Sequence, residues 1–230
     1  MARLPRPLVP LMTLLLLLFP VRAGATIARA VTFDEKVENA ASIVLGKCIR
    51  QETRWDDAKK WILTYSTFQV EKAYKGGSTG QITIVTPGGR VDDVAQEVIG
   101  MPRFQEGEDH VLFVRNSQVG PTVLYLEQGA YRVEAGERGE RRVQPLVSNA
   151  VLVDSQRGVA VAPERPRSLR EFETTVTQTV ARGRQQQMEL AARKKQEESS
   201  LWNQLRRNSP LVLLALVGAA LATWQLMKRN

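Results

Sequence analysis

The sequence predicts a mainly β fold: a small antiparallel barrel or sandwich, followed by an amphipathic helix, a helical stalk and a C-terminal transmembrane helix. Three observations lead to this prediction. Short apolar runs rich in β-branched residues alternate with turns that contain Gly or Pro, as far as residue 154. Beyond that point the chain becomes polar, with apolar residues at helical spacing. Each end of the chain carries an apolar segment without charged side chains.

Residues 1–25 have the layout of a secretory signal peptide. Arg3 and Arg6 form a positive start, the apolar run 8–19 follows, and small residues occupy 23–25. The run has 12 residues, fewer than the ~20 that a membrane-spanning helix needs. We therefore expect cleavage near residue 25 and export of the remainder.

Residues 26–154 form the expected β domain. A short helix over 32–41 is predicted because Thr32 is followed at the capping-box spacing by Glu35. Two long strands, 43–55 and 61–74, surround a polar turn and predict a hairpin. Shorter strands with glycine-containing breaks are expected at 81–86, 110–114, 123–128, 130–135, 141–146 and 149–154.

The charge and cysteine content of this domain narrow its function. Residues 26–154 carry 16 basic and 18 acidic side chains, so the net charge of +8 resides in the two ends of the chain. A slightly acidic domain lacks the basic footprint of a nucleic-acid-binding protein, so no nucleic acid partner is expected. Cys48 is the only cysteine, which excludes an intramolecular disulfide. Its apolar neighbours predict that it is buried.

The remainder of the chain is predicted to attach the protein to the membrane. Residues 155–167 form a linker with two prolines, and 168–208 form a helical stalk that starts with a capping box and an amphipathic stretch. Residues 210–227 include the 17-residue uncharged run 211–227 and are expected to cross the membrane, which makes membrane lipid a partner. Residues 228–230 form a short cytoplasmic tail.

Several sequence elements together resemble a known domain. They are ASIVLGKCIRQETRWD, TYSTFQVEKAYKGG, ITIVTPGGRV, GMPRFQEGEDHVLFV, GAYRV and RRVQPLVSNAVLV. This pattern, over residues 30–153, resembles a functionally uncharacterised bacterial exported domain. That domain is similar to the oligomer-binding (OB) barrels of metalloproteinase tissue inhibitors and netrin-type modules. The resemblance implies an OB-like barrel on the outer, periplasmic or extracellular side of a bacterial cytoplasmic membrane.

The resemblance does not carry the inhibitors' mechanism over to this chain. In metalloproteinase inhibitors an N-terminal cysteine chelates the zinc of the target. Here the expected mature N-terminus is Gly24 or Thr26, and Cys48 is interior.

His110, the only histidine, follows three acidic residues, Glu106, Glu108 and Asp109. A zinc site needs further His or Cys ligands, and a catalytic His needs a placed nucleophile. The sequence offers neither pattern, so we interpret His110 as part of the scaffold. No cofactor and no metal are expected.

The best candidate for partner binding is the hairpin tip, where Trp55, Trp61 and Tyr65 lie beside Arg54. Trp and Arg dominate the hot spots of protein interfaces. The sequence thus favours a non-enzymatic interaction module of the bacterial cell envelope that binds an envelope or extracellular protein. An inhibitor or regulator of an exported protease is the alternative, and an enzyme with an unrecognised site is the third. The oligomeric state is not predicted.

Overall fold

The computed structural model describes residues 27–77, 80–136, 139–146 and 151–228. Within the last range, the side chains of 201–223 and 225–226 are outside the description. The expected signal peptide, residues 1–25, also lies outside the described residues. The chain divides after Glu173 into two compact units.

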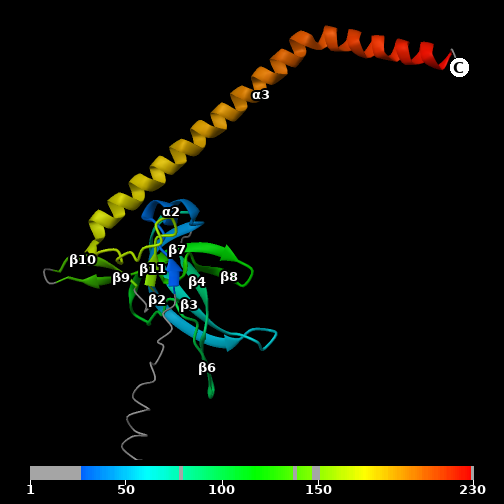
Figure 1. Ribbon diagram of the computed structural model, residues 1–230. Helices are drawn as coiled ribbons and strands as arrows, with labels where there is room; N and C mark the ends of the chain where they lie inside the picture. Colours follow the sequence, from blue (N-terminus) through cyan, green and yellow to red (C-terminus); the bar gives the residue numbers. More distant parts are fainter. Residues whose placement is uncertain (1–26, 78–79, 137–138, 147–150, 229–230) are drawn as a thin grey trace, which may run out of the picture. The chain divides into compact units, whose positions relative to one another are not determined.

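The first unit is built around one large antiparallel sheet (Figure 1). Its strands follow the order β12-β10-β9-β7-β2-β3-β4, and β8 pairs with β7 outside this path. This sheet confirms the mainly β prediction. The strands are β2 (Ser42–Trp55), β3 (Ile62–Lys75), β4 (Gln81–Pro87), β7 (Asp109–Ser117), β8 (Gly120–Val123), β9 (Ala130–Ala135), β10 (Arg141–Pro145) and β12 (Arg167–Ser168).

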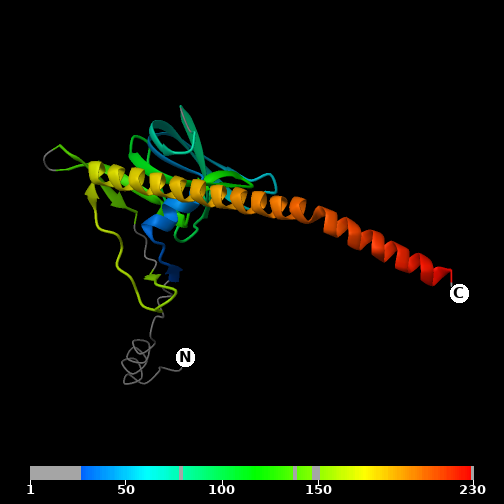
Figure 2. The same ribbon diagram turned by 90° about the horizontal axis from the view of Figure 1, so that it is seen from above.

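Smaller elements surround this sheet. β1 and β11 pair in parallel and lie side by side in Figure 2, and β5 and β6 form a short hairpin. The bounds are β1 (Ile27–Arg29), α2 (Phe33–Asn39), β5 (Gly89–Val91), β6 (Val94–Gln96), η1 (Leu126–Gly129), β11 (Val151–Val153) and α3 (Leu169–Met227). Thr32 caps α2 by accepting a hydrogen bond from the Glu35 amide, as the sequence predicts.

The sheet does not close into a barrel among the described strands, contrary to the expected OB-like barrel. β4 and β8 are in contact, and Gly120 of β8 lies against Val85 of β4, but no ladder of backbone hydrogen bonds joins the two strands. β8 has only four residues and uses them to pair with the end of β7. The described sheet is therefore open between β4 and β8.

The strand expected over 123–128 is also wrong. β8 ends at Val123, and a 3-10 turn follows at Leu126–Gly129. Tyr125 and Leu126 both have left-handed backbone angles, φ 57° and 60°, which a strand cannot contain. The apolar residues of this run therefore lie in a sharp reversal of the chain and not in a strand.

The centre of the sheet is buried on both faces. One face of β2 and β7 packs into an inner cluster of Val44, Cys48, Phe68, Ile84, Phe104, Leu112, Val114, Val123 and Ala130. The other face carries Phe113, which meets the rings of Phe33, Tyr131 and Phe172 at centroid distances of 5.7–6.3 Å. Two-sided burial explains why the runs around Val44 and Phe113 are continuously apolar. Cys48 is buried, which confirms the prediction from its apolar neighbours.

A buried lysine joins distant parts of the first unit. Lys36 of α2 is only 3% exposed, and its ammonium donates to the Gln128 carbonyl at 3.1 Å, to the Tyr131 hydroxyl at 2.6 Å and to the Glu164 carboxylate. Tyr131 in turn donates to Glu164 at 3.0 Å. Burial lowers the pKa of Lys36, although the charge of Glu164 opposes that shift. All three ammonium protons have acceptors, which is the condition for keeping such a charge buried.

The second unit is the continuation of α3 from Thr174. Among the residues with described side chains, no helix has the length and apolarity needed to cross a membrane. The expected transmembrane segment, 210–227, falls almost wholly in the part of α3 whose side chains lie outside the described residues. The expected tail, 228–230, is described only at Lys228.

Lys36→Met tests the buried network. The substitution keeps the apolar stem and removes the donor to the Tyr131 hydroxyl and to the Gln128 carbonyl, while Glu164 keeps Tyr131 and Arg167 as donors. We therefore expect the free energy of unfolding to fall by about 2 kcal/mol. Urea unfolding of the full-length protein in detergent measures this change. The double variant Lys36→Met/Glu164→Gln removes both charges and is expected to lose less than the single variant. A Lys36→Met protein as stable as the wild type would contradict a structural role for the network.

Candidate functional site

A polar groove lies on the inner face of the sheet, beyond the end of the apolar cluster. Its volume is about 520 Å³, within the range of small-molecule sites. The β2, β3 and β4 strands form its floor, and the segment from Gly88 to Phe104 forms its wall and rim. The floor residues are Gln51, Thr53, Thr64, Ser66 and Thr86.

A β-bulge in β2 directs two of these side chains into the groove. Cys48 pairs with Phe68 and Arg50 pairs with Thr67, so Ile49 is an extra residue in β2. Side chains alternate along a strand, and one extra residue exchanges the two faces for everything that follows. Gln51 therefore lies on the same face as Cys48.

The floor is a set of hydroxyl and amide groups that hold one another. Thr53 and Thr64 are cross-strand partners with hydroxyl oxygens 3.3 Å apart. The Gln51 side-chain amide donates to the fully buried Ser66 hydroxyl at 3.0 Å. The Thr64 hydroxyl donates to the Gly88 carbonyl at 2.7 Å. These bonds fix the floor groups in place, and each hydroxyl oxygen keeps a lone pair that can accept a further hydrogen bond.

Gly89 allows the wall to approach this floor closely. A Cβ atom at Gly89 would stand 2.5 Å from the Thr53 methyl group and 2.6 Å from the Thr64 hydroxyl oxygen. Its φ of 137° is also one that side chains disfavour. Only glycine satisfies both conditions, so the Gly88-Gly89 turn packs directly onto the threonine pair.

The ionisable residues that line the groove stand at its rim. They are Arg90, Glu97 and Arg103, and all three are exposed. Arg103 donates to the Glu97 carboxylate at 2.5 Å, so these two charges neutralise each other. The floor itself carries no charge.

The apolar side of the groove rests on Phe104, which is 4% exposed. The ring meets Phe68 edge-on at a centroid distance of 5.1 Å and His110 at 5.0 Å. Such T-shaped contacts stabilise an aromatic position beyond simple burial. The inner cluster thus holds the base of the wall rigid.

His110 is fully buried behind Phe104, on the face shared by Glu108 of the preceding turn and Arg132 of β9. Its Nε2 atom is 3.6 Å from a Glu108 oxygen, and the other Glu108 oxygen is 3.4 Å from Arg132 Nε. Within the described part of the chain, neither nitrogen of His110 has a hydrogen-bond partner. Burial, and then the positive charge of Arg132, lower the pKa of His110 to about 4. The imidazole is therefore neutral at physiological pH, in keeping with a scaffold role.

The four residues proposed for the hairpin tip do not share one surface. Arg54 stacks over the Tyr65 ring at 4.2 Å on the outer face of the hairpin. Trp55 pairs with Ile62, and strand alternation puts it on the opposite, inner face, where it is half-buried. Trp61 precedes β3 and is 47% exposed. The structure thus brings Arg54 and Tyr65 together and separates Trp55 from them.

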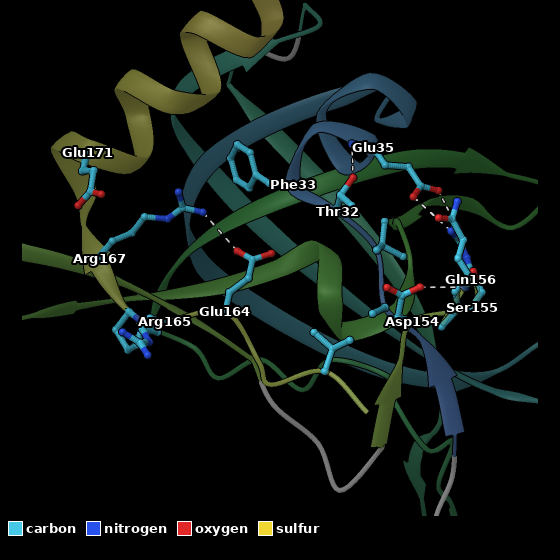
Figure 3. Close-up of a pocket in the computed structure, with 15 residues that line it drawn as sticks. Thr32, Phe33, Glu35, Asp154, Ser155, Gln156, Glu164, Arg165, Arg167 and Glu171 are labelled. Atoms are coloured by element: carbon cyan, nitrogen blue, oxygen red, sulfur yellow. Dashed lines mark hydrogen bonds and ion pairs between the residues drawn. The ribbon is translucent and has the colours of Figure 1, made fainter. Parts of the chain in front are cut away.

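A second depression, of about 730 Å³, lies between the β1–α2 connection and residues 154–171 (Figure 3). Most of its charges are already paired. Arg29 binds Glu35 at 2.5 Å, and Arg167 binds Glu164 at 3.2 Å while stacking over the Phe33 ring at 4.6 Å. These pairs anchor the segment before α3, so we interpret this depression as structural.

Sequence reasoning missed the groove. Its signal is present as polar residues at every second position, Gln51 and Thr53 in one strand and Thr64 and Ser66 in the other. Alternating polar residues ordinarily mark a solvent-exposed face, so the pattern alone does not indicate a concave site.

Comparisons with protein-family models, curated proteins and solved structures gave no significant match to this chain.

The buried, neutral His110 predicts acid-sensitive stability. Its pKa is about 4 in the folded protein and 6.5 in the unfolded chain, so the unfolded chain binds the proton first as pH falls. Its stabilising contribution is complete above pH 6.5 and decreases as pH falls to about 4, by roughly 3 kcal/mol in total. Urea unfolding across this pH range measures the loss.

His110→Leu is the matched control for this prediction. It removes two nitrogens that have no partner among the described residues, and we expect its stability at neutral pH to stay within about 1.5 kcal/mol of the wild type. Its unfolding free energy should change less between pH 6.5 and 4, because only carboxylates then titrate. Identical pH profiles for the two proteins would show that the pKa of His110 does not change when the protein unfolds.

Proposed function

We propose that this protein is a non-enzymatic binding module of the bacterial cell envelope and that its ligand occupies the polar groove. The observation that carries the proposal is the preorganised floor, in which Thr53, Thr64 and Gln51 are fixed by one another and by buried neighbours. Groups already ordered lose little entropy when a ligand binds.

The chemistry of the groove supports binding more than catalysis. Acid–base and nucleophilic mechanisms need a titratable group beside the reacting atom. Among the residues that line the groove, the ionisable ones are the rim residues Arg90, Glu97 and Arg103. The described floor offers hydroxyl and amide groups, which recognise a ligand without a built-in base.

The proposal includes the location of the module. In it, residues 1–25 direct export, residues 210–227 anchor the chain in the cytoplasmic membrane as a single pass, and the β domain faces the periplasm or the exterior. The resemblance to exported OB-like domains supports this arrangement, although the described sheet is open. Exposed Trp61, with Arg54 and Tyr65, then provides a secondary contact for an envelope protein.

Cysteine labelling tests the location. Lys60 is exposed in the β2–β3 turn, whereas Cys48 is buried, so a Lys60→Cys variant carries one reactive thiol. We expect a membrane-impermeant maleimide to label this thiol in spheroplasts without lysis. Wild-type protein, with Cys48 alone, is the control for background. Labelling that requires lysis would place the domain on the cytoplasmic side.

Photo-crosslinking in growing cells tests the groove. A benzophenone amino acid at the position of Arg90, on the rim, is expected to capture an envelope component, and the same group at Gln118, exposed in the β7–β8 turn, is not. The double variant Thr53→Val/Thr64→Val removes the central hydroxyl pair and should strongly reduce the yield of the adduct.

Thr67→Val/Thr83→Val is the matched control for this experiment. These threonines form a hydroxyl pair at 3.1 Å between β3 and β4, on the face opposite the groove. The adduct should persist in this variant. Equal capture from the Arg90 and Gln118 positions, or none from either, would exclude the groove as the binding site.

A further inference from the structure

We infer that the ligand of the groove is a neutral glycan, recognised through its hydroxyl and amide groups. This inference rests on the proposed function and specifies the ligand class. The residues that line the groove provide three kinds of group, and each restricts the ligand in a different way.

The uncharged floor restricts the polarity of the ligand. The Thr64 hydroxyl donates its proton to the Gly88 carbonyl and therefore accepts from Thr53, so both hydroxyl oxygens keep lone pairs that can accept from a ligand. Gln51 adds an amide whose nitrogen donates to Ser66. In the described structure the Gln51 side-chain oxygen has no protein donor, so it is available as an acceptor. These acceptors match a ligand that presents several O–H and N–H donors, as sugar hydroxyls and acetamido groups do.

The wall restricts the shape of the ligand. Val98, Met101 and Phe104, which belong to the wall segment, give the groove an apolar lining beside the polar floor. A pyranose ring has polar edges and a face of C–H groups, so it satisfies a site with hydroxyls on one side and apolar atoms on another. Small-molecule sites in general combine an apolar lining with a few placed polar groups.

The charges restrict the ligand to a neutral one. An anionic ligand would require cations at the floor, where Arg or Lys can bind it bidentately or as a point charge. The lining cations, Arg90 and Arg103, are instead at the exposed rim, and Glu97 neutralises Arg103. A cationic ligand would lack a carboxylate on the floor. Charge therefore favours a neutral saccharide over an acidic one.

Titration calorimetry of the full-length protein with a neutral β-1,4-linked N-acetylglucosamine trisaccharide tests this inference. The detergent must be zwitterionic, because alkyl glycosides carry a neutral sugar that would compete. We expect binding that Thr53→Val/Thr64→Val weakens about tenfold, which corresponds to the loss of one or two hydrogen bonds. The matched control Thr67→Val/Thr83→Val should change the affinity less than about twofold.

Two further probes decide against the inference if they bind in place of the neutral sugar. A galacturonic acid trisaccharide that binds more tightly would indicate an acidic ligand, and a neutral Ser/Thr-rich hexapeptide that alone binds would indicate an extended peptide. If the trisaccharide does not bind and the Arg90 crosslink still forms, the glycan inference is wrong and the groove remains a binding site. If neither trisaccharide binding nor the Arg90 crosslink is observed, the glycan inference and the proposed function are both wrong.

Discussion

Burial of both faces of β2 and β7 is the constraint on which the rest of the first unit depends. Two buried faces need two covers. Phe113 is covered by the aromatic rings of Phe33, Tyr131 and Phe172, and Val44 on the opposite face is covered by the inner cluster. The inner cover ends at Phe104. Beyond that residue the same face carries hydroxyl and amide groups, so the groove begins where the apolar filling of the sheet stops.

Lys36 and His110 are both buried and ionisable, and they differ in their partners. Each ammonium proton of Lys36 has an acceptor, and the opposite charge of Glu164 counters the lowering of the Lys36 pKa by burial. His110 has no partner for either nitrogen among the described residues, and burial keeps it neutral. The first arrangement ties the segment before α3 to α2. The second makes His110 an aromatic spacer that supports Phe104, and so the wall of the groove.

The groove differs from the charged depression in how its polar groups are used. In the depression, Arg29 and Arg167 are already bound to carboxylates, so its polarity serves the fold. In the groove, the floor groups are ordered but uncharged, and Gly89 shows how closely the wall is fitted to Thr53 and Thr64. A rigid polar floor beside an apolar wall is the arrangement expected of a recognition site.

The sequence by itself determined the local elements. Thr32 and Glu35 mark the start of α2, and the long hairpin follows from its β-branched runs, because capping and strand patterns act between residues close in the chain. Only the tertiary structure decided the site. The side of the sheet that Gln51 faces depends on the bulge at Ile49, which exists only in the pairing with β3. The partner of Lys36 is 128 positions away, at Glu164. Such contacts depend on which strands and segments meet in three dimensions, and no local pattern encodes that choice.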